Sequence, residues 1–333
     1  MKTFVIAISF LFVSVQSYAQ FDPLQEKRDL VNTIIDLAET HICNPAFLKT
    51  DAWDTFTNYI QSKEVLSLED AQFTKVFNKA TRDLTFTHFY IKYSDKEKRR
   101  KAKKRAKEKG TQKAFELSEI DSGTGLLTIR KFIPNASLMK TLVAEVSQKE
   151  YENLIIDLRG NRGGTLDAAV VLGQFITPNM IDAGSYLSRS WFEQHDDYPT
   201  EQEINSFPFL TDMSYAGFKE AAKNPAFRMV IPPHENPTFK GKVYVLTDKY
   251  TASTCEPFVY LLKEQGVAQI VGEHTSGAML SGAGFKLAKN MSLFIPVQDY
   301  ITADGSRLDK IGVAPTVKTT SEEALSTVLE LLK

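Results

Sequence analysis

Cysteine and histidine are both scarce in this sequence of 333 residues. The two cysteines, Cys43 and Cys255, can form at most one bridge, which excludes a disulfide-stapled scaffold. Because Cys255 lies at the start of an apolar segment, we expect it to be a small packed residue and not a redox centre. No histidine stands in an HExxH motif or at another paired-ligand spacing, so neither a metal site nor an organic cofactor is predicted. The histidines are His41, His88, His195, His234 and His274.

A surplus of charge is also missing. The chain carries 40 Lys and Arg against 41 Asp and Glu, a net charge of -1. No overall attraction to nucleic acid or to an anionic surface is therefore predicted. With 43% hydrophobic residues the chain can bury a full core, and its length suggests about two domains. We find no internal repeat, and the oligomeric state stays open.

One long apolar run occurs, near the start of the chain. Residues 1–20 carry a lysine, an apolar stretch from Phe4 to Val15, and small or polar residues up to Ala19 and Gln20. This layout predicts a signal peptide that is cleaved near Ala19 or Gln20. A membrane anchor kept in the mature protein is the alternative, but the run is short for a bilayer span. We expect an exported protein, periplasmic or extracellular, without a transmembrane segment in the mature chain.

The pattern changes once along the rest of the chain. Residues 21–83 repeat apolar positions at helical spacing and predict a small helical N-terminal domain. In residues 84–333 short apolar strands alternate with helices, which predicts an α/β core. Strands are expected at Phe86–Ile91, Leu126–Phe132, Leu154–Leu158 and Val243–Leu246, and helices at Leu166–Ile176, Pro257–Lys263 and a final segment ending at Leu332.

Two segments interrupt the α/β pattern. Residues 96–109 hold ten Lys or Arg against two Glu, which indicates a basic insertion. A solvated helical excursion is the plain interpretation, and docking to an acidic partner or to the protein's own acidic face is the alternative. Residues 192–236 are rich in aromatic, proline and charged residues. Long irregular segments of this kind often cover binding sites.

A crowded junction, DKYTASTCEPF, holds a candidate nucleophile. Pro257 has no amide proton and is tolerated only in the first turn of a helix, so the helix begins between Ser253 and Cys255. Ser253 is therefore placed where a strand feeds a helix, beside unpaired N–H groups and the positive end of the helix dipole. Such a place suits stabilisation of an oxyanion. A serine that only caps the helix would produce the same pattern.

A second candidate element is the loop DLRGNRGG at 157–164, between a predicted strand and a predicted helix. Consecutive glycines let a backbone approach a ligand closely or point its amides into a site. The phosphate-loop patterns GxxxxGK[ST] and GxGxxG are both absent from it. A plain tight turn is the alternative interpretation.

Four segments together resemble a known family. They are LIIDLRGNRGG, KVYVLTDKYTASTCEPF, VGEHTSG and IGVAP, in this order. Their order is similar to that of the motifs of the C-terminal-processing and tricorn-core serine peptidases, over roughly residues 84–317. The resemblance implies a crotonase-like (ClpP/crotonase) α/β fold and hydrolysis of peptide bonds by a serine.

The resemblance also implies roles for individual residues. Ser253 matches the nucleophile, and the oxyanion donors would be the amide of Thr254 and that of Gly163 or Gly164. Tail-specific members use a lysine base in GExTxGK, where this chain has Ala278. The usual serine–lysine mechanism is therefore not available to it.

The tricorn-like branch implies a different base. It uses a histidine preceded by a hydroxyl residue on an early strand, with an acid just before the GVxP motif. Thr87, His88 and Asp309 match these positions in type. A histidine suits the task because it titrates near neutrality and can accept and return the serine proton. We therefore expect Ser253 to act with His88, oriented through Thr87 and Asp309.

Other positions depart from the family pattern. Arg162 replaces a loop glycine, and Thr316 replaces the Asp of GVxPD. For Arg162 a solvent-facing position is the plain interpretation, and contact with a substrate carboxylate is the alternative. His274 and Ser276 are expected to shape their loop. No room exists for a PDZ domain between the first two predicted strands, so selection of substrates by their C-terminus is not implied.

The sequence thus predicts an exported serine peptidase that acts on a peptide or protein substrate. One alternative is an inactive homologue that binds peptides or regulates a partner, as the lost lysine would indicate. Another is a carrier of apolar ligands, because the resemblance extends to retinoid-binding proteins with this core.

Overall fold

The computed structural model describes residues 23–95, 100, 113–236, 238–288 and 290–333. The predicted signal peptide at 1–20 and nearly all of the predicted basic insertion at 96–109 lie outside the described residues. Within the described part, no helix is long and apolar enough to span a membrane.

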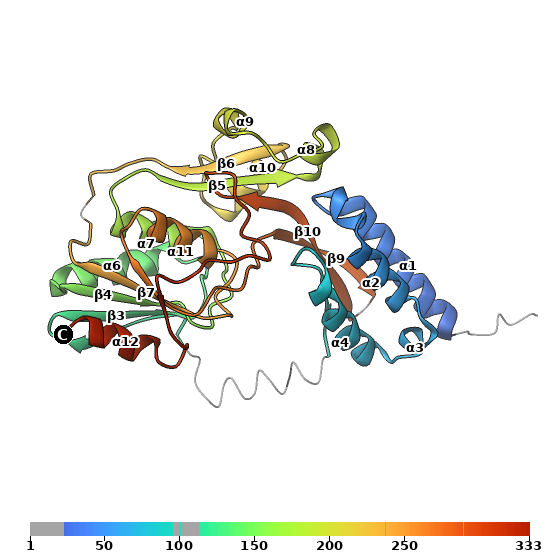
Figure 1. The fold of residues 1–333 in the computed structure, drawn as a ribbon, viewed down its shortest axis with the longest axis horizontal. Helices are drawn as coiled ribbons and strands as arrows, with labels where there is room; N and C mark the ends of the chain where they lie inside the picture. The colour runs from blue at the N-terminus through green and yellow to red at the C-terminus, as the bar shows by residue number, and fades with distance from the viewer. Residues whose placement is uncertain (1–22, 96–99, 101–112, 237, 289) are drawn as a thin grey trace, which may run out of the picture.

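One six-stranded sheet forms the base of the α/β region (Figure 1). Five of its strands are parallel, and the edge strand β2 pairs with β3 in the antiparallel sense. The central strands β4 and β7 are apolar and buried along nearly their whole length, as parallel strands covered on both faces require. In spatial order the strands are β11 (Val317–Lys318), β8 (Gln269–Gly272), β7 (Lys242–Thr247), β4 (Asn153–Asp157), β3 (Thr124–Ile129) and β2 (Phe115–Asp121).

Helices cover both faces of this sheet. Helix α12 packs its buried Ala324 and Val328 on one face. The other face carries α6, α7 and α11, and the core beneath them is continuous with side chains of the second sheet, including Tyr186 and Tyr300. Figure 1 accordingly shows α7 and α11 between the two sheets. The bounds are α6 (Ala136–Lys149), α7 (Leu166–Ile176), α11 (Cys255–Glu264) and α12 (Ala324–Leu331).

The second sheet is antiparallel in all its pairings and is built around the long strand β10. It follows the order β1-β10-β5-β6, and β9 also pairs with β10. Its strands are β1 (Tyr90–Tyr93), β5 (Ile181–Ser188), β6 (Ala226–Ile231), β9 (Ser281–Ala288) and β10 (Met291–Ile301).

The N-terminal segment is helical, as its apolar spacing predicts, and it packs on the second sheet. One hydrophobic cluster joins buried residues of α1, α2 and α4 to Ile91, Leu293 and Ile295 of β1 and β10. The helices therefore share their core with β10, which lies more than 200 residues later in the chain. The elements are α1 (Pro23–His41), η1 (Pro45–Leu48), α2 (Asp51–Ile60), α3 (Lys63–Leu66), α4 (Asp70–Ala80) and η2 (Thr81–Asp83).

Most predicted elements are present, but the strand expected at Phe86–Ile91 is wrong over its first four residues. The chain bends through residues 84–87, and β1 begins only at Tyr90, which pairs with Phe294. The apolar residues that produced the strand pattern have another partner. Phe86 stacks on Phe47 at 5.1 Å between ring centres and belongs to the helical core. His88, expected on a strand, instead has a φ of 60° just before one.

The segment 192–236 is less irregular than expected. It contains the second half of α8 (Arg189–Gln194), all of α9 (Glu201–Ser206) and α10 (Tyr215–Ala221), and strand β6. Short helices of six or seven residues leave little periodicity to recognise in a sequence. The expectation that this segment covers a site is tested by the cavity described below.

Candidate active site

The conspicuous polar loops meet at one edge of the six-stranded sheet. The glycine-rich loop follows β4, the segment with Ser253 follows β7, and the GEHTSG loop follows β8. These three strands are parallel neighbours, so their carboxyl ends lie side by side. In open α/β sheets this edge is where ligands bind.

Ser253 lies at the turn between β7 and α11, with a φ of 57°. A non-glycine residue in this left-handed region is strained, and such strain gathers at functional sites. Its N–H donates to the Ala278 carbonyl at 3.1 Å and to Glu256 Oε2 at 3.0 Å. Thr254, and not Ser253, is the cap residue of α11. In the described part of the chain the Ser253 hydroxyl accepts no hydrogen bond from an N–H of α11, so the capping explanation for this serine is wrong.

Glu256 holds the turn in place, and the sequence analysis did not single it out. Its fully buried carboxylate accepts hydrogen bonds from Thr275 Oγ1 at 2.7 Å, the Gly277 amide at 2.7 Å and the Ala278 amide at 2.8 Å, in addition to Ser253. Burial raises its pKa, and these bonds oppose the rise. A signal existed, because Glu256 is the last residue of TASTCE.

The glycine-rich loop packs directly against Ser253. Asn161 fixes the loop: its Nδ2 donates to the Ile129 carbonyl at 2.9 Å, and its Oδ1 accepts from the Gly163 amide at 2.9 Å. A Cβ atom on Gly163 would lie 2.7 Å from Ser253 Cβ, so only glycine permits this approach. The Gly163 amide is committed to Asn161 and does not point into the site.

Two neighbouring amides remain without an acceptor among the described residues, those of Gly164 and Thr254. Gly164 passes so close to Phe132 that an added Cβ would lie 1.7 Å from the Phe132 carbonyl oxygen. The Thr254 hydroxyl donates to the Gly164 carbonyl at 2.9 Å and links the two segments. Of the alternatives Gly163 and Gly164, the geometry favours Gly164 as an oxyanion donor.

His88, Thr87 and Asp309 form a chain of hydrogen bonds across 222 residues of sequence. Thr87 Oγ1 lies 2.9 Å from His88 Nδ1 and 2.5 Å from Asp309 Oδ1. The Asp309 carboxylate, 1% exposed, also accepts from the Thr87 amide at 3.0 Å and the Met279 amide at 2.9 Å. The structure therefore brings the three predicted residues together in the predicted order.

Burial moves the pKa values of both titratable members in opposite directions. It lowers the pKa of His88 to about 4, so the imidazole is neutral at pH 7. It raises the pKa of Asp309 to about 6, against the effect of the Thr87 and Met279 hydrogen bonds. At pH 7 the pair therefore consists of a neutral ring and a carboxylate.

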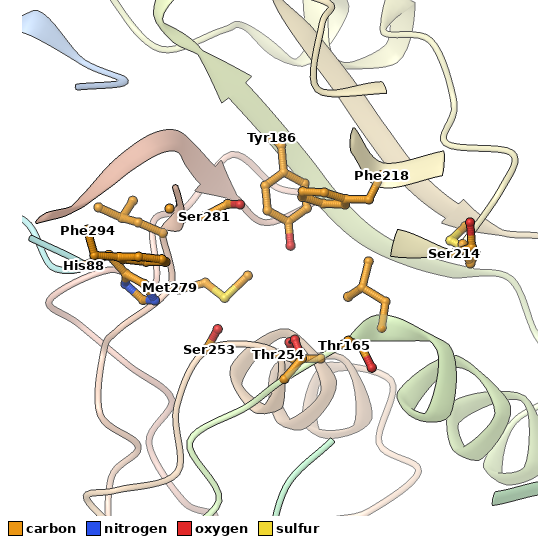
Figure 2. Close-up of a pocket in the computed structure, with 15 residues that line it drawn as sticks. His88, Thr165, Tyr186, Ser214, Phe218, Ser253, Thr254, Met279, Ser281 and Phe294 are labelled. Carbon is orange, nitrogen blue, oxygen red and sulfur yellow. The ribbon is translucent and has the colours of Figure 1, made fainter. Parts of the chain in front are cut away.

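Ser253 and His88 face the same cavity of about 220 Å³ (Figure 2). Gly164 and Thr254 also line it, and most of the other lining side chains are apolar, with Thr165, Ser214 and Ser281 as polar exceptions. Met213 and Phe218 come from the segment 192–236, so this segment does cover the site. The apolar lining residues are Leu166, Tyr186, Met213, Phe218, Met279, Leu280 and Phe294.

A second, wider groove of about 650 Å³ is also lined by Ser253 and His88. Arg82, Arg162 and Lys249 line it, together with Tyr250. The sequence predicts a site role for only one of these four residues: the alternative interpretation of Arg162 is contact with a substrate carboxylate.

The remaining predicted positions have smaller parts. Ala278 stands at the position where tail-specific members have a lysine base. Its backbone is hydrogen-bonded to Ser253 and Glu256. His274 and Ser276 are exposed on their loop, and Ser276 borders the groove. Cys43 and Cys255 are both buried and reduced, and burial raises the pKa of the Cys255 thiol. Among the described residues, no group of three His, Cys, Asp or Glu could hold a metal ion.

A serine at a strand end, faced by a histidine and by backbone N–H donors, recurs in the serine hydrolases as a class. Within the class, residues 123–319 of this sequence match Peptidase family S41. This match spans more than half of the chain, which therefore belongs to that family. It confirms the resemblance predicted from the four motifs.

Curated relatives share only part of their length with this chain. The carboxy-terminal processing protease CtpA of Bacillus subtilis is 24% identical over 199 residues, 60% of this chain and 35% of that protein. The carboxyl-terminal-processing protease of a Picosynechococcus species is 23% identical over 193 residues, 57% of this chain and 38% of that protein. The chain thus spans little more than a third of the length of these relatives.

Two solved structures resemble the whole described fold. A candidate peptidase from Parabacteroides merdae has a TM-score of 0.61 at 14% identity and covers 92% of this chain and 96% of its own. A lipoprotein from Streptococcus agalactiae has a TM-score of 0.55 at 16% identity and covers 98% of this chain and 99% of its own. At these identities the likeness concerns the fold alone.

Proposed function

We propose that this protein is a serine peptidase in which Ser253 attacks the peptide bond and His88 takes its proton. The observation that carries the proposal is the series of hydrogen bonds from His88 through Thr87 to Asp309. The His88 ring and Ser253 line the same cavity. Membership in Peptidase family S41 supports the reaction class. No cofactor is required by this chemistry.

The hydrogen bonds define which nitrogen of His88 is basic. An ionised Asp309 can only accept, so the Thr87 hydroxyl must donate its single proton to Oδ1. The Thr87 oxygen then accepts a hydrogen bond from the His88 Nδ1–H group, which leaves the lone pair on Nε2. This tautomer presents a base to the cavity, and the buried charge of Asp309 would stabilise the imidazolium that forms.

The proposed reaction follows from these positions. His88 Nε2 removes the Ser253 proton as Oγ attacks the carbonyl carbon, and the amides of Gly164 and Thr254 hold the oxyanion. The C–N bond then breaks, and Nε2 returns the proton to the leaving amine. Water then attacks the acyl-enzyme, Nε2 takes the proton of the water, and Nε2 returns this proton to Ser253 Oγ as the ester bond breaks. In the uncomplexed protein Ser253 and His88 share no hydrogen bond, and such contacts often tighten only with substrate.

The apolar cavity supports a preference for the residue that carries the scissile carbonyl. Gly164 and Thr254, the proposed oxyanion donors, line this cavity. Met213, Phe218 and Phe294 line it, so an apolar side chain of moderate size fits it best. Its volume of about 220 Å³ lies below the range of about 300–1,000 Å³ typical of drug-sized ligand pockets, which does not favour an apolar-ligand carrier.

The proposal extends to the organisation of the chain. The alternation of parallel strands and helices is compatible with a crotonase-like core over residues 84–333, and residues 21–83 would form a helical domain docked on it. The N-terminal composition supports export to the periplasm or the medium. Peptides or proteins in that compartment would be the substrates.

A fluorophosphonate probe tests the proposed nucleophile. The purified protein is incubated with the probe and the adduct is located by mass spectrometry, beside Ser253→Ala and His88→Ala. We expect an adduct on Ser253 in the wild type, none in Ser253→Ala, and labelling at least about a hundredfold slower in His88→Ala. A folded wild type without an adduct would refute the activated serine and favour the peptide-binding alternative.

A further inference from the structure

The wider groove beside Ser253 and His88 is lined by three positively charged side chains. Arg82, Arg162 and Lys249 line it, and no carboxylate is among its lining residues. In the described part of the chain none of the three side chains forms an ion pair. Cations that converge on a groove without partners leave their charge available to an anion.

The nearby carboxylates are already occupied. Asp248 is buried, and it accepts hydrogen bonds from the amides of Gly160 and Tyr250 at 2.9 Å each. Glu273 Oε2 accepts from the Lys249 amide at 3.3 Å and does not line the groove. Their backbone partners, and not the side chains of Arg162 or Lys249, hold these acids.

Two of the cations are held over one aromatic ring. The Arg162 guanidinium and the Lys249 ammonium each lie 5.5 Å from the centre of the Tyr250 ring. The Arg162 backbone is fixed from both sides, because the amide of Gly163 donates a hydrogen bond to the side chain of Asn161. Such anchoring lowers the entropy that the side chain loses when it binds an anion.

We propose that this groove, which shares Ser253 and His88 with the apolar cavity, binds a carboxylate of the peptide substrate. The inference rests on the proposed function for the direction of the peptide. Because the oxyanion donors border the cavity, the residue with the scissile carbonyl lies there. The groove then receives the residues after the scissile bond. The carboxylate is either an acidic side chain or the C-terminus of the peptide. In this proposal Arg162 is a binding residue.

Binding to the Ser253→Ala protein tests the groove without requiring catalysis. Three fluorescein-labelled hexapeptides share an apolar residue at position three. The first carries glutamate at position five and an amidated C-terminus. The second carries glutamine there and an amidated C-terminus, and the third carries glutamine and a free C-terminal carboxylate. Fluorescence anisotropy at low and high salt measures each Kd.

We expect a peptide with a carboxylate to bind about tenfold more tightly than the glutamine amide peptide. Exposed ion pairs each contribute a modest factor and are screened by salt, so the advantage falls as ionic strength rises. The better of the two carboxylate peptides identifies the source of the charge. Adding Arg162→Gln and Lys249→Gln reduces the advantage to less than about twofold. The matched pair Lys131→Gln and Lys318→Gln, exposed and outside the groove, leaves it unchanged.

Equal affinity for the three peptides, or no binding at all, would overturn the inference. So would a carboxylate preference that survives Arg162→Gln and Lys249→Gln. Failure of the proposed function appears elsewhere, as absence of a fluorophosphonate adduct on wild-type Ser253. A retained carboxylate preference together with that absence would support the groove and reject hydrolysis.

Discussion

Replacement of Asp309 by asparagine removes the charge that, in the proposed mechanism, sets the tautomer of His88. Asp309 accepts three hydrogen bonds, from Thr87 Oγ1, the Thr87 amide and the Met279 amide. An asparagine has one accepting oxygen, so in either orientation its NH₂ group faces a backbone N–H. A buried donor left without a partner costs about 1–3 kcal/mol, and we expect Asp309→Asn to unfold more easily by that amount.

The effect on reactivity should exceed the effect on stability. With asparagine in place the Thr87 hydroxyl faces either a neutral amide oxygen, which is a weaker acceptor than the carboxylate, or an NH₂ group that donates to it. The tautomer with the lone pair on Nε2 therefore loses support. General-base assistance typically contributes on the order of 10² to 10⁴ in rate, and we expect the second-order rate of Ser253 phosphonylation to fall within that range. The rate is read from gel fluorescence at increasing probe concentration.

The pH dependence adds a second signature. As the pH falls through the Asp309 pKa of about 6, the acid gains a proton that it can donate to Thr87, and the wild-type rate should drop although His88 stays neutral down to about 4. Asp309→Asn should lack this step near pH 6. The exposed Asp304, in the turn after β10, offers a control as Asp304→Asn. Thr87→Val breaks the same series if Asp309→Asn does not fold.

A wild-type rate in Asp309→Asn, or a step near pH 6 that persists in it, would refute the reasoning. Either result would mean that His88 does not depend on the carboxylate. A thermal melt followed by circular dichroism accompanies each rate, so that lost reactivity is separated from lost structure.

Three further changes extend the account. Gly164→Ala puts a Cβ 1.7 Å from the Phe132 carbonyl oxygen and should abolish Ser253 labelling or folding, read by the probe and by a melt; an active, stable Gly164→Ala would contradict the close approach. Glu256→Gln replaces an acceptor of four hydrogen bonds and should lower the free energy of unfolding in urea by about 1–3 kcal/mol; no change would show that the turn holds without this carboxylate. Because burial lowers the His88 pKa to about 4, the unfolded state gains this proton first as pH falls, and His88 costs stability between about pH 6.5 and 4. His88→Gln should therefore gain up to about 3 kcal/mol relative to wild type across that interval, and parallel stability curves would reject the shifted pKa.

Much of the α/β region could be predicted because its strands and helices are regular and covered on both faces. Helix α7 has the predicted bounds, Leu166–Ile176, because an apolar helix between two sheets has an unmistakable composition. The strand at Phe86–Ile91 failed for the opposite reason. Its apolar residues are shared between a helical core and a sheet, and nothing in the local sequence reveals that His88 turns the chain between them.

Part of the candidate site could be predicted from the sequence for similar reasons. Ser253, His88 and Asp309 stand in motifs whose residue types are tied to chemistry, so each could be named from the sequence. The choice between Gly163 and Gly164 could not be made, because it depends on whether Asn161 engages one amide. The groove cation Arg82 belongs to no motif, and Lys249 lies in the DKYTASTCEPF segment without a role that the motif assigns. Folding alone brings their separate segments to the same edge of the site.

Hydrolysis of peptide bonds by Ser253 is tested most directly in water enriched in ¹⁸O. A mixture of peptides is incubated with the wild type and with Ser253→Ala, and new C-termini are identified by mass spectrometry. The account predicts new C-termini that carry ¹⁸O with the wild type and none with Ser253→Ala. Equal cleavage by both proteins, or no cleavage by a folded wild type whose Ser253 is labelled by the probe, would contradict it.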